Sequence, residues 1–80
     1  MSYDKVIITL QSEKPNDGCK TDIRLVSWNE DRPVLEKRQF TFDKQTRTLR
    51  PGRARGFTLE EFIKLVNDKD EIIRAWKESL

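Results

Sequence analysis

The chain has 80 residues, of which 35% are hydrophobic and 38% are charged, and its formal net charge is +2. A chain this short forms one domain, residues 1–80, and buries only roughly 60% of its unfolded surface, so oligomerisation would usefully extend its core. The absence of histidine and the single cysteine, Cys19, exclude a Cys/His zinc site and an internal disulfide. No apolar run approaches the ~20 residues of a membrane span and no signal peptide is apparent, so we expect an intracellular protein without membrane contact.

The basic residues are concentrated in one segment. Residues 37–55 carry seven basic side chains and one acidic side chain, a net charge of +6, whereas the segments before and after it each carry −2. Phe40 and Phe42 lie among these cations, followed by Pro51 and Gly52. Clustered cations interleaved with aromatic rings are typical of surfaces that bind nucleic acid, and this clustering indicates more about partners than the total charge does.

Four segments have the alternation or the β-branched composition of strands: residues 5–11, 21–28, 33–42 and 48–50. Turn-forming residues separate these segments at 12–18, 29–33 and 43–47. We expect Pro51 and Gly52 to interrupt the fourth ladder, because proline cannot donate a backbone hydrogen bond. Such short connections predict an antiparallel meander.

The alternation also assigns side chains to the two faces of this sheet. Ile23 and Leu25 share one face, which we expect to pack against the rest of the fold. The opposite face carries rings and cations, namely Arg24, Trp28, Arg38, Phe40 and Phe42. A bulge in the third strand would turn one of its two phenylalanines inward, so Phe40 is the preferred stacking residue and Phe42 is its alternative.

A helix is predicted after the sheet. Thr58 and Glu61 have the spacing of a capping box, and Phe57 and Phe62 have that of a hydrophobic staple. Apolar residues then recur at helical spacing as far as the last residue.

The four polar residues 67–70 interrupt this apolar stripe and predict a kink or a break, where Asp68 and Glu71 have the spacing of a second capping box. The predicted fold class is therefore α+β, with a four-stranded antiparallel sheet followed by one long kinked C-terminal helix.

Catalysis is not indicated by these residues. There is no histidine, and the carboxylates are dispersed over both ends of the chain. Asp68, Asp70 and Glu71 do not match the spacing of an EF-hand loop, so no metal is assigned. We expect neither an enzyme nor a cofactor.

Binding across the sheet face is the stronger hypothesis. A protein that holds single strands without reading sequence presents rings to stack on bases and cations to contact phosphates. The candidate stacking residues are Trp28 and Phe40. The candidate phosphate-binding residues are Arg24, Lys37, Arg38, Arg47, Arg50, Arg53 and Arg55. The alternative, in which Trp28 belongs to the core and the cations are merely solvated, is disfavoured because Trp28 shares its face with Arg24.

Three sequence blocks carry a family resemblance: SWN at 27–29, KRQF at 37–40 and RPGRARGFTLEEF at 50–62. Together they resemble the single-stranded-DNA-binding domain of the transcriptional coactivator positive cofactor four and its small bacterial and phage relatives. The similarity covers residues 21–76. The loop between Gly52 and Gly56, which contains Arg55, is one residue longer than in the coactivator.

The resemblance implies a homodimer joined through the C-terminal helices, with Leu65, Ile72, Ile73 and Trp76 at the interface, and sequence-independent binding of single-stranded DNA or of melted duplex. The long serine-rich regulatory tail of the coactivator has no counterpart in these residues, so a role in bacterial or phage replication, recombination or transcription is favoured over coactivation. Replication or transcription proteins would then be further partners. Two alternatives stay open, an RNA-binding module and a protein-interaction module whose basic segment docks on an acidic partner.

Overall fold

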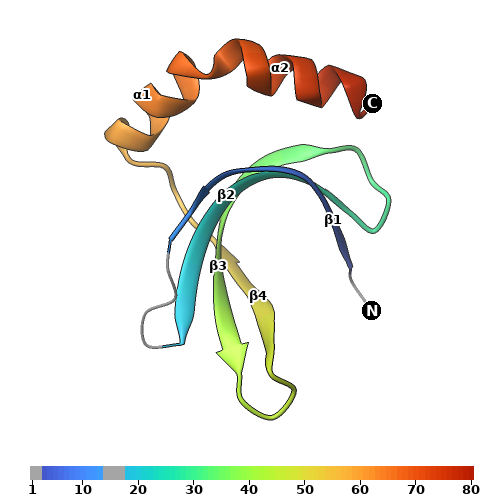
Figure 1. Ribbon diagram of the computed structural model, residues 1–80, viewed down its shortest axis with the longest axis vertical. Coiled ribbons are helices and arrows are strands. Elements are labelled where there is room, and N and C mark those ends of the chain that lie inside the picture. The colour runs from blue at the N-terminus through green and yellow to red at the C-terminus, as the bar shows by residue number, and fades with distance from the viewer. Residues whose placement is uncertain (1–2, 14–17) are drawn as a thin grey trace.

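The structure, a computed structural model, describes residues 3–13 and 18–80. Four strands, β1 (Asp4–Ser12), β2 (Cys19–Trp28), β3 (Val34–Asp43) and β4 (Thr48–Ala54), form one sheet with the order β1-β2-β3-β4. All neighbours are antiparallel, and two helices follow, α1 (Leu59–Asn67) and α2 (Lys69–Glu78) (Figure 1). The predicted α+β class and the meander are thereby confirmed.

The two hairpin turns lie where the turn-forming residues predicted them. Between β2 and β3, Asn29 and Glu30 adopt positive φ values of 51° and 65°, a conformation that asparagine tolerates better than most residues. Between β3 and β4, the Asp43 carboxylate accepts a hydrogen bond of 2.9 Å from the backbone N–H of Gln45. The turn predicted at 12–18 falls largely outside the described residues.

Strand β4 is longer than predicted. It continues through Pro51 and Gly52 to Ala54, so the strand does not end before Pro51 as predicted, although the ladder with β3 is irregular between Pro51 and Ala54, where its register shifts. The reason is that β4 is an edge strand, where a proline without an N–H is tolerated. Glycine is required at position 52, because a Cβ there would lie 2.9 Å from the carbonyl oxygen of Gln39.

The capping box at the start of α1 is present. The backbone N–H of Glu61 donates to Thr58 Oγ1 at 3.2 Å, and the Thr58 N–H donates to Glu61 Oε1 at 2.9 Å. The single long kinked helix does not form, but the break predicted as its alternative at residues 67–70 is present: two helices are separated by Asp68, with φ −99° and ψ 13°. Its side chain makes no capping hydrogen bond, so the second predicted capping box does not form.

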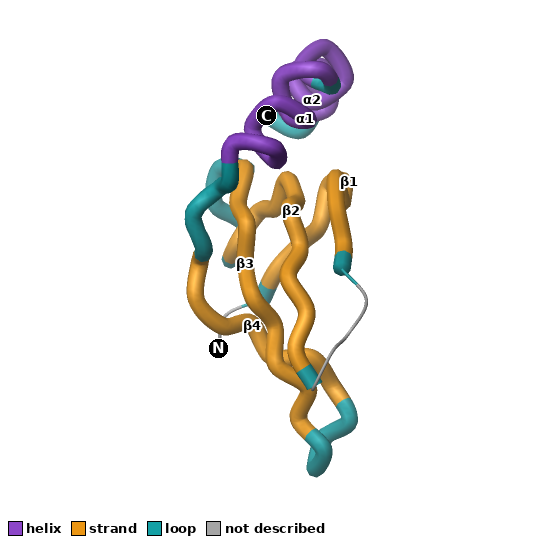
Figure 2. The backbone as a smooth tube through the Cα atoms, turned by 90° about the vertical axis from the view of Figure 1, so that its left-hand side faces the viewer, coloured by secondary structure: helices purple, strands orange, loops and turns teal. Residues whose placement is uncertain are grey.

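The sheet is strongly bent, and both helices lie across the outside of the bend, at one end of the sheet (Figures 1 and 2). The buried apolar core is small and consists of Ile23, Leu25, Val26, Phe40 and Ile72. Trp76 anchors α2, because its Nε1 donates a hydrogen bond of 3.0 Å to the carbonyl oxygen of Pro33. None of the described helices is long and apolar enough to cross a bilayer.

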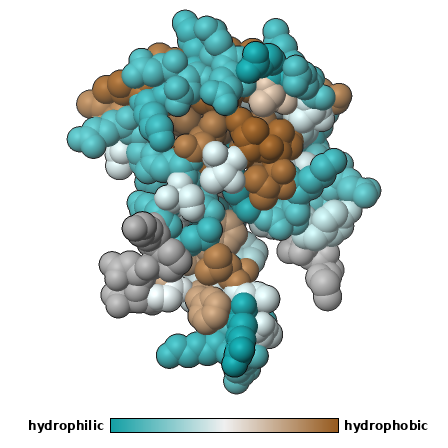
Figure 3. All heavy atoms as spheres, viewed as in Figure 1, coloured by the Kyte–Doolittle hydropathy of each residue, from teal (hydrophilic) through white to brown (hydrophobic). Residues whose placement is uncertain are grey.

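Much of the apolar surface of the helices stays exposed. Helix α1 contains no buried residue. The exposed apolar side chains on the two helices are Leu59, Phe62, Ile63, Val66 and Ile73. Apolar atoms are visible at the surface beneath the helices in Figure 3. The protomer therefore leaves part of its predicted apolar stripe without a partner.

Candidate nucleic-acid interface

The sheet has a helix-facing side and an open side, and the strand register assigns each residue to one of them. Arg24 pairs with Glu36 across β2 and β3, and Lys20 pairs with Phe40. Directly paired residues project to the same side of a sheet. The open side consequently gathers a group that we call the open-face cluster: Arg24, Trp28, Glu36, Arg38 and Phe40.

Glu36 lies at the centre of the open-face cluster. Its Oε1 accepts hydrogen bonds of 3.3 Å from both Nε and Nη2 of Arg24. Its Oε2 accepts from Nε and Nη2 of Arg38 at 3.1 and 2.9 Å. The Trp28 Nε1–H lies 3.2 Å from each of the two oxygens. One carboxylate thus fixes two guanidinium groups and the indole of Trp28.

The sequence did not lead us to predict Glu36 as the central hydrogen-bond acceptor of this cluster, although its position in the third strand indicated that role. Glu36 precedes Arg38 by two residues and therefore shares its side of the strand, and the predicted hairpin brings it opposite Arg24. An acid that shares one face of a sheet with cations on its own and the neighbouring strand indicates an ion-pair network. Within the described residues, every buried side-chain nitrogen or oxygen has a hydrogen-bond partner.

The protonation of Glu36 is set by these neighbours. Burial alone raises the pKa of its carboxyl, but hydrogen bonds from Arg38 and Trp28, together with the charges of Arg38 and Arg24, outweigh burial and hold the pKa below its usual value. Because the pKa of this carboxyl is lower in the folded than in the unfolded state, the ionised carboxylate stabilises the fold at pH values above its unfolded pKa of about 4.3. This stabilisation is lost as the pH falls through the pKa of the folded state.

We therefore expect the stability advantage of the wild type over Glu36→Gln to be full near pH 6 and to shrink below about pH 4, as Glu36 itself becomes protonated. Urea unfolding between pH 6 and pH 2.5 measures it. The exposed Glu78 provides the control, since Glu78→Gln makes the same change of side chain outside the open-face cluster. A wild-type advantage over Glu36→Gln that is constant over this range would contradict the assignment.

The two predicted stacking rings differ in access. The guanidinium carbon of Arg24 lies 4.6 Å from the centroid of the Phe40 ring, and Phe40 is only 6% exposed. Lys20 also approaches this ring, at 5.9 Å. The structure therefore does not present Phe40 as an open platform, because the cations of the neighbouring strand cover it.

Trp28, in contrast, is half-buried and borders open space. The guanidinium carbons of Arg38 and Arg24 lie 5.1 and 5.3 Å from the centroid of the Trp28 ring, both cation–π geometries. Its greater exposure, and not a lack of neighbouring cations, therefore distinguishes Trp28 from Phe40. Together with Asn29, Pro51 and Gly52, Trp28 and Arg38 line a hollow of about 320 Å³, which we call the Trp28 hollow. No acidic residue lines it.

Arg24 is placed differently from a phosphate-binding residue. It is 4% exposed. Its Nη1 lies 2.7 Å from a carboxylate oxygen of Asp4, and its Nη2 lies 3.3 Å from Glu36. Because both ends of its guanidinium group are paired to carboxylates, Arg24 is a buried structural member of the open-face cluster and does not face solvent.

Lys37 belongs to the helix-facing side, because it alternates with Glu36 and Arg38 along β3. Its Nζ contacts Glu61 Oε1 at 2.6 Å and the carbonyl oxygen of Gly56 at 3.2 Å. These bonds tie β3 to the start of α1. The structure therefore does not bring Lys37 together with the open-face cluster.

The remaining candidate arginines, Arg47, Arg50, Arg53 and Arg55, are exposed on and around β4. Arg50 pairs with Thr41 in the register and contacts Asp43 at 3.2 Å, which places it on the helix-facing side of the edge strand. Arg55 donates from Nε to the side-chain oxygen of Gln39 at 3.2 Å. Their charge surrounds the edge of the sheet and does not converge on one point.

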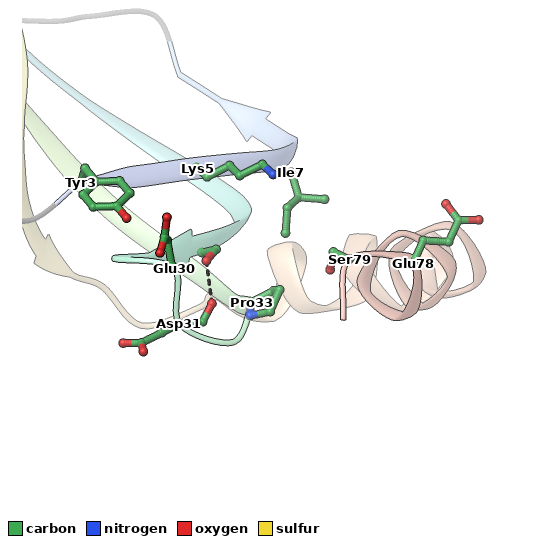
Figure 4. Close-up of a pocket in the computed structure, with 9 residues that line it drawn as sticks. Tyr3, Lys5, Ile7, Glu30, Asp31, Pro33, Glu78 and Ser79 are labelled. Carbon is green, nitrogen blue, oxygen red and sulfur yellow. Dashed lines mark hydrogen bonds between the residues drawn. The ribbon is translucent and has the colours of Figure 1, made fainter.

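A second cavity, of about 480 Å³, lies between the start of β1, the turn after β2 and the end of α2 (Figure 4). Its lining includes the carboxylates of Glu30, Asp31 and Glu78 but only one cation, Lys5. This charge balance does not suit an anionic ligand. No group of His, Cys, Asp or Glu side chains that could hold a metal ion is found in residues 3–13 and 18–80.

Comparison with known proteins adds no relative: no protein-family model, no curated protein and no solved structure matches this chain. The resemblance seen in residues 21–76 accordingly stays a prediction, and functional conclusions depend on the geometry of the open face.

Proposed function

We propose that this chain is a sequence-independent single-stranded-DNA-binding protein that holds an unpaired strand on the open side of its sheet. The Trp28 hollow is the observation that carries the proposal. It combines an accessible indole with a guanidinium group and lacks acidic lining. Stacking on an aromatic ring tolerates any base, because every base has a flat π-face.

The hydrogen bonds of Arg38 support a role in holding phosphate. Three of its bonds are to protein oxygens: two to Glu36 and one, from Nη1, of 2.6 Å to the carbonyl oxygen of Gly52. A guanidinium group has five N–H donors, so two remain for a ligand. The three existing bonds hold the side chain in place, so little conformational entropy is lost when a phosphate binds.

The exposed apolar residues of the helices support a homodimer as part of this proposal. Of the four predicted interface residues, Ile72 is buried within the protomer, and Leu65 and Trp76 are half-buried there. Ile73 is 47% exposed. We place the interface on Ile73 and on the exposed residues of α1, Phe62, Ile63 and Val66.

Pairing two protomers would give the protein two open faces. Binding of two separated strands would favour duplex opening by mass action, in keeping with a role in replication, recombination or transcription.

Replacing Trp28 with alanine is expected to weaken binding of (dT)12 by about 1 to 3 kcal/mol, because one base–ring stack is lost. Fluorescence anisotropy of a labelled oligonucleotide measures the affinity. Trp28→Phe is the matched control, since it also removes the Nε1–H bond to Glu36 but keeps a ring, and it should retain most of the affinity. Equal losses in both variants would contradict stacking.

The same titration separates the alternatives. A protein-interaction module would bind DNA weakly and independently of Trp28. An RNA-binding module would prefer (rU)12 to (dT)12, because contacts to the 2′-hydroxyl distinguish RNA from DNA. The single-strand proposal is sustained if (dT)12 binds at least as tightly as (rU)12 and depends on Trp28.

A further inference from the structure

We propose that the β3–β4 hairpin carries a second base-binding point on the open side, formed by Phe42, Leu49 and Arg47, which we call the hairpin platform. This inference rests on the function proposed above and extends it. It assigns base stacking to the ring of Phe42 instead of that of Phe40. It also implies that a DNA strand needs a minimum length to contact both the Trp28 hollow and the hairpin platform.

The platform has the chemistry that an unpaired nucleotide requires. Phe42 and Leu49 are directly paired across β3 and β4, and they are 42% and 38% exposed. With Arg47 and Gly18 they line a hollow of about 560 Å³. A single exposed apolar side chain would need no explanation. Here an aromatic ring and a leucine lie side by side next to a guanidinium group, which suits a base and its phosphate.

The platform is built into the sheet. The backbone N–H of Phe42 donates a hydrogen bond of 2.6 Å to the carbonyl oxygen of Gly18. Arg47 follows with φ 57° at the end of a turn whose backbone is held by Asp43. The ladder between Phe40 and Phe42 is regular, so Phe42 projects to the same side as the open-face cluster.

The platform lies in line with the Trp28 hollow. Arg38, which lines the hollow, precedes Phe42 by four residues on β3, a separation of about 13 Å at the rise of a strand. A strand stacked as in a duplex would cover this distance with roughly four nucleotides, at about 3.4 Å each. Between the two points, Arg24 and Lys20 cover Phe40. Both of these cations are paired with carboxylates, Arg24 with Asp4 and Glu36 and Lys20 with Asp22. The two ends of the path are therefore the points that offer rings to bases.

The length of the DNA strand gives the test. Phe42→Ala should weaken binding of (dT)12 by roughly 5- to 150-fold, the loss of one stacked base, and should leave binding of (dT)3 at the Trp28 hollow unchanged. Phe42→Tyr keeps a ring and should retain the affinity for (dT)12. Leu59→Ala is the control for removal of an exposed apolar side chain, since Leu59 lies in α1 and is 73% exposed.

Isothermal titration with both oligonucleotides separates the outcomes. If Trp28→Ala weakens binding of (dT)12 and Phe42→Ala does not, the hairpin platform is wrong and the proposed function stands. If Phe42→Ala weakens (dT)3 and (dT)12 equally, Phe42 acts through the sheet and the platform is again wrong. If neither variant changes the affinity for (dT)12, the proposed function falls together with the platform.

Discussion

Replacing Glu36 with alanine is expected to lower the free energy of unfolding by about 3 kcal/mol, the typical cost of breaking a buried ion pair by removing one partner. Arg24, which is 4% exposed, would lose one of its two carboxylate partners and keep Asp4. Arg38 and the indole of Trp28 would lose their shared acceptor. Domains of this size are stable by only about 5 to 15 kcal/mol, so the loss is large.

Urea unfolding at one fixed protein concentration measures this loss, because oligomerisation would make the apparent stability depend on concentration. The matched control is Glu78→Ala. Glu78 is exposed in the last turn of α2, where an acidic residue opposes the helix dipole. Its removal should therefore be neutral or slightly stabilising. Similar urea midpoints of unfolding for the wild type and Glu36→Ala would show that the hydrogen bonds and ion pairs of Glu36 contribute little to stability.

Replacing Ile73 with aspartate is expected to convert dimers into monomers. In a two-fold interface the substitution occurs twice, and each copy forfeits the burial of an isoleucine side chain, about 1.5 to 3 kcal/mol. The combined loss of at least ~3 kcal/mol weakens the dimer by at least ~150-fold. Because Ile73 is 47% exposed in the protomer, the fold itself should persist.

Sedimentation equilibrium at micromolar concentrations measures the change in mass. Arg74→Asp is the control, because it introduces the same charged side chain at an exposed neighbouring position. It should leave the dimer intact. A wild type that stays monomeric at tens of micromolar, or an Ile73→Asp variant that stays dimeric, would remove the proposed interface. Circular dichroism verifies that the variant is folded.

Local patterns predicted the elements of this fold well, and the reason is physical. Side chains alternate across a strand with a period of two, so Arg24 and Trp28 are separated from Ile23 and Leu25 in any strand that contains them. The capping box of Thr58 and Glu61 likewise depends on residues three positions apart. The alternation and the capping box both depend only on residues that are close together in the sequence.

Three features depended on residues that are distant in the sequence. Whether Phe40 is open or covered depends on Arg24 and Lys20, which belong to another strand. Whether β4 can contain Pro51 depends on its place at the edge of the sheet. Whether Phe42 is exposed depends on which distant segments reach the end of the hairpin, and among the described residues its side chain is 42% exposed.

Local sequence patterns were enough to locate the four strands and to assign their residues to the two sides of the sheet, because both properties follow from backbone geometry over a few residues. Which rings and cations on the open side are reachable depends on the tertiary structure. Burial is set by neighbours from other strands, and here they cover Phe40 and Arg24 while leaving Trp28 beside a hollow and Phe42 exposed.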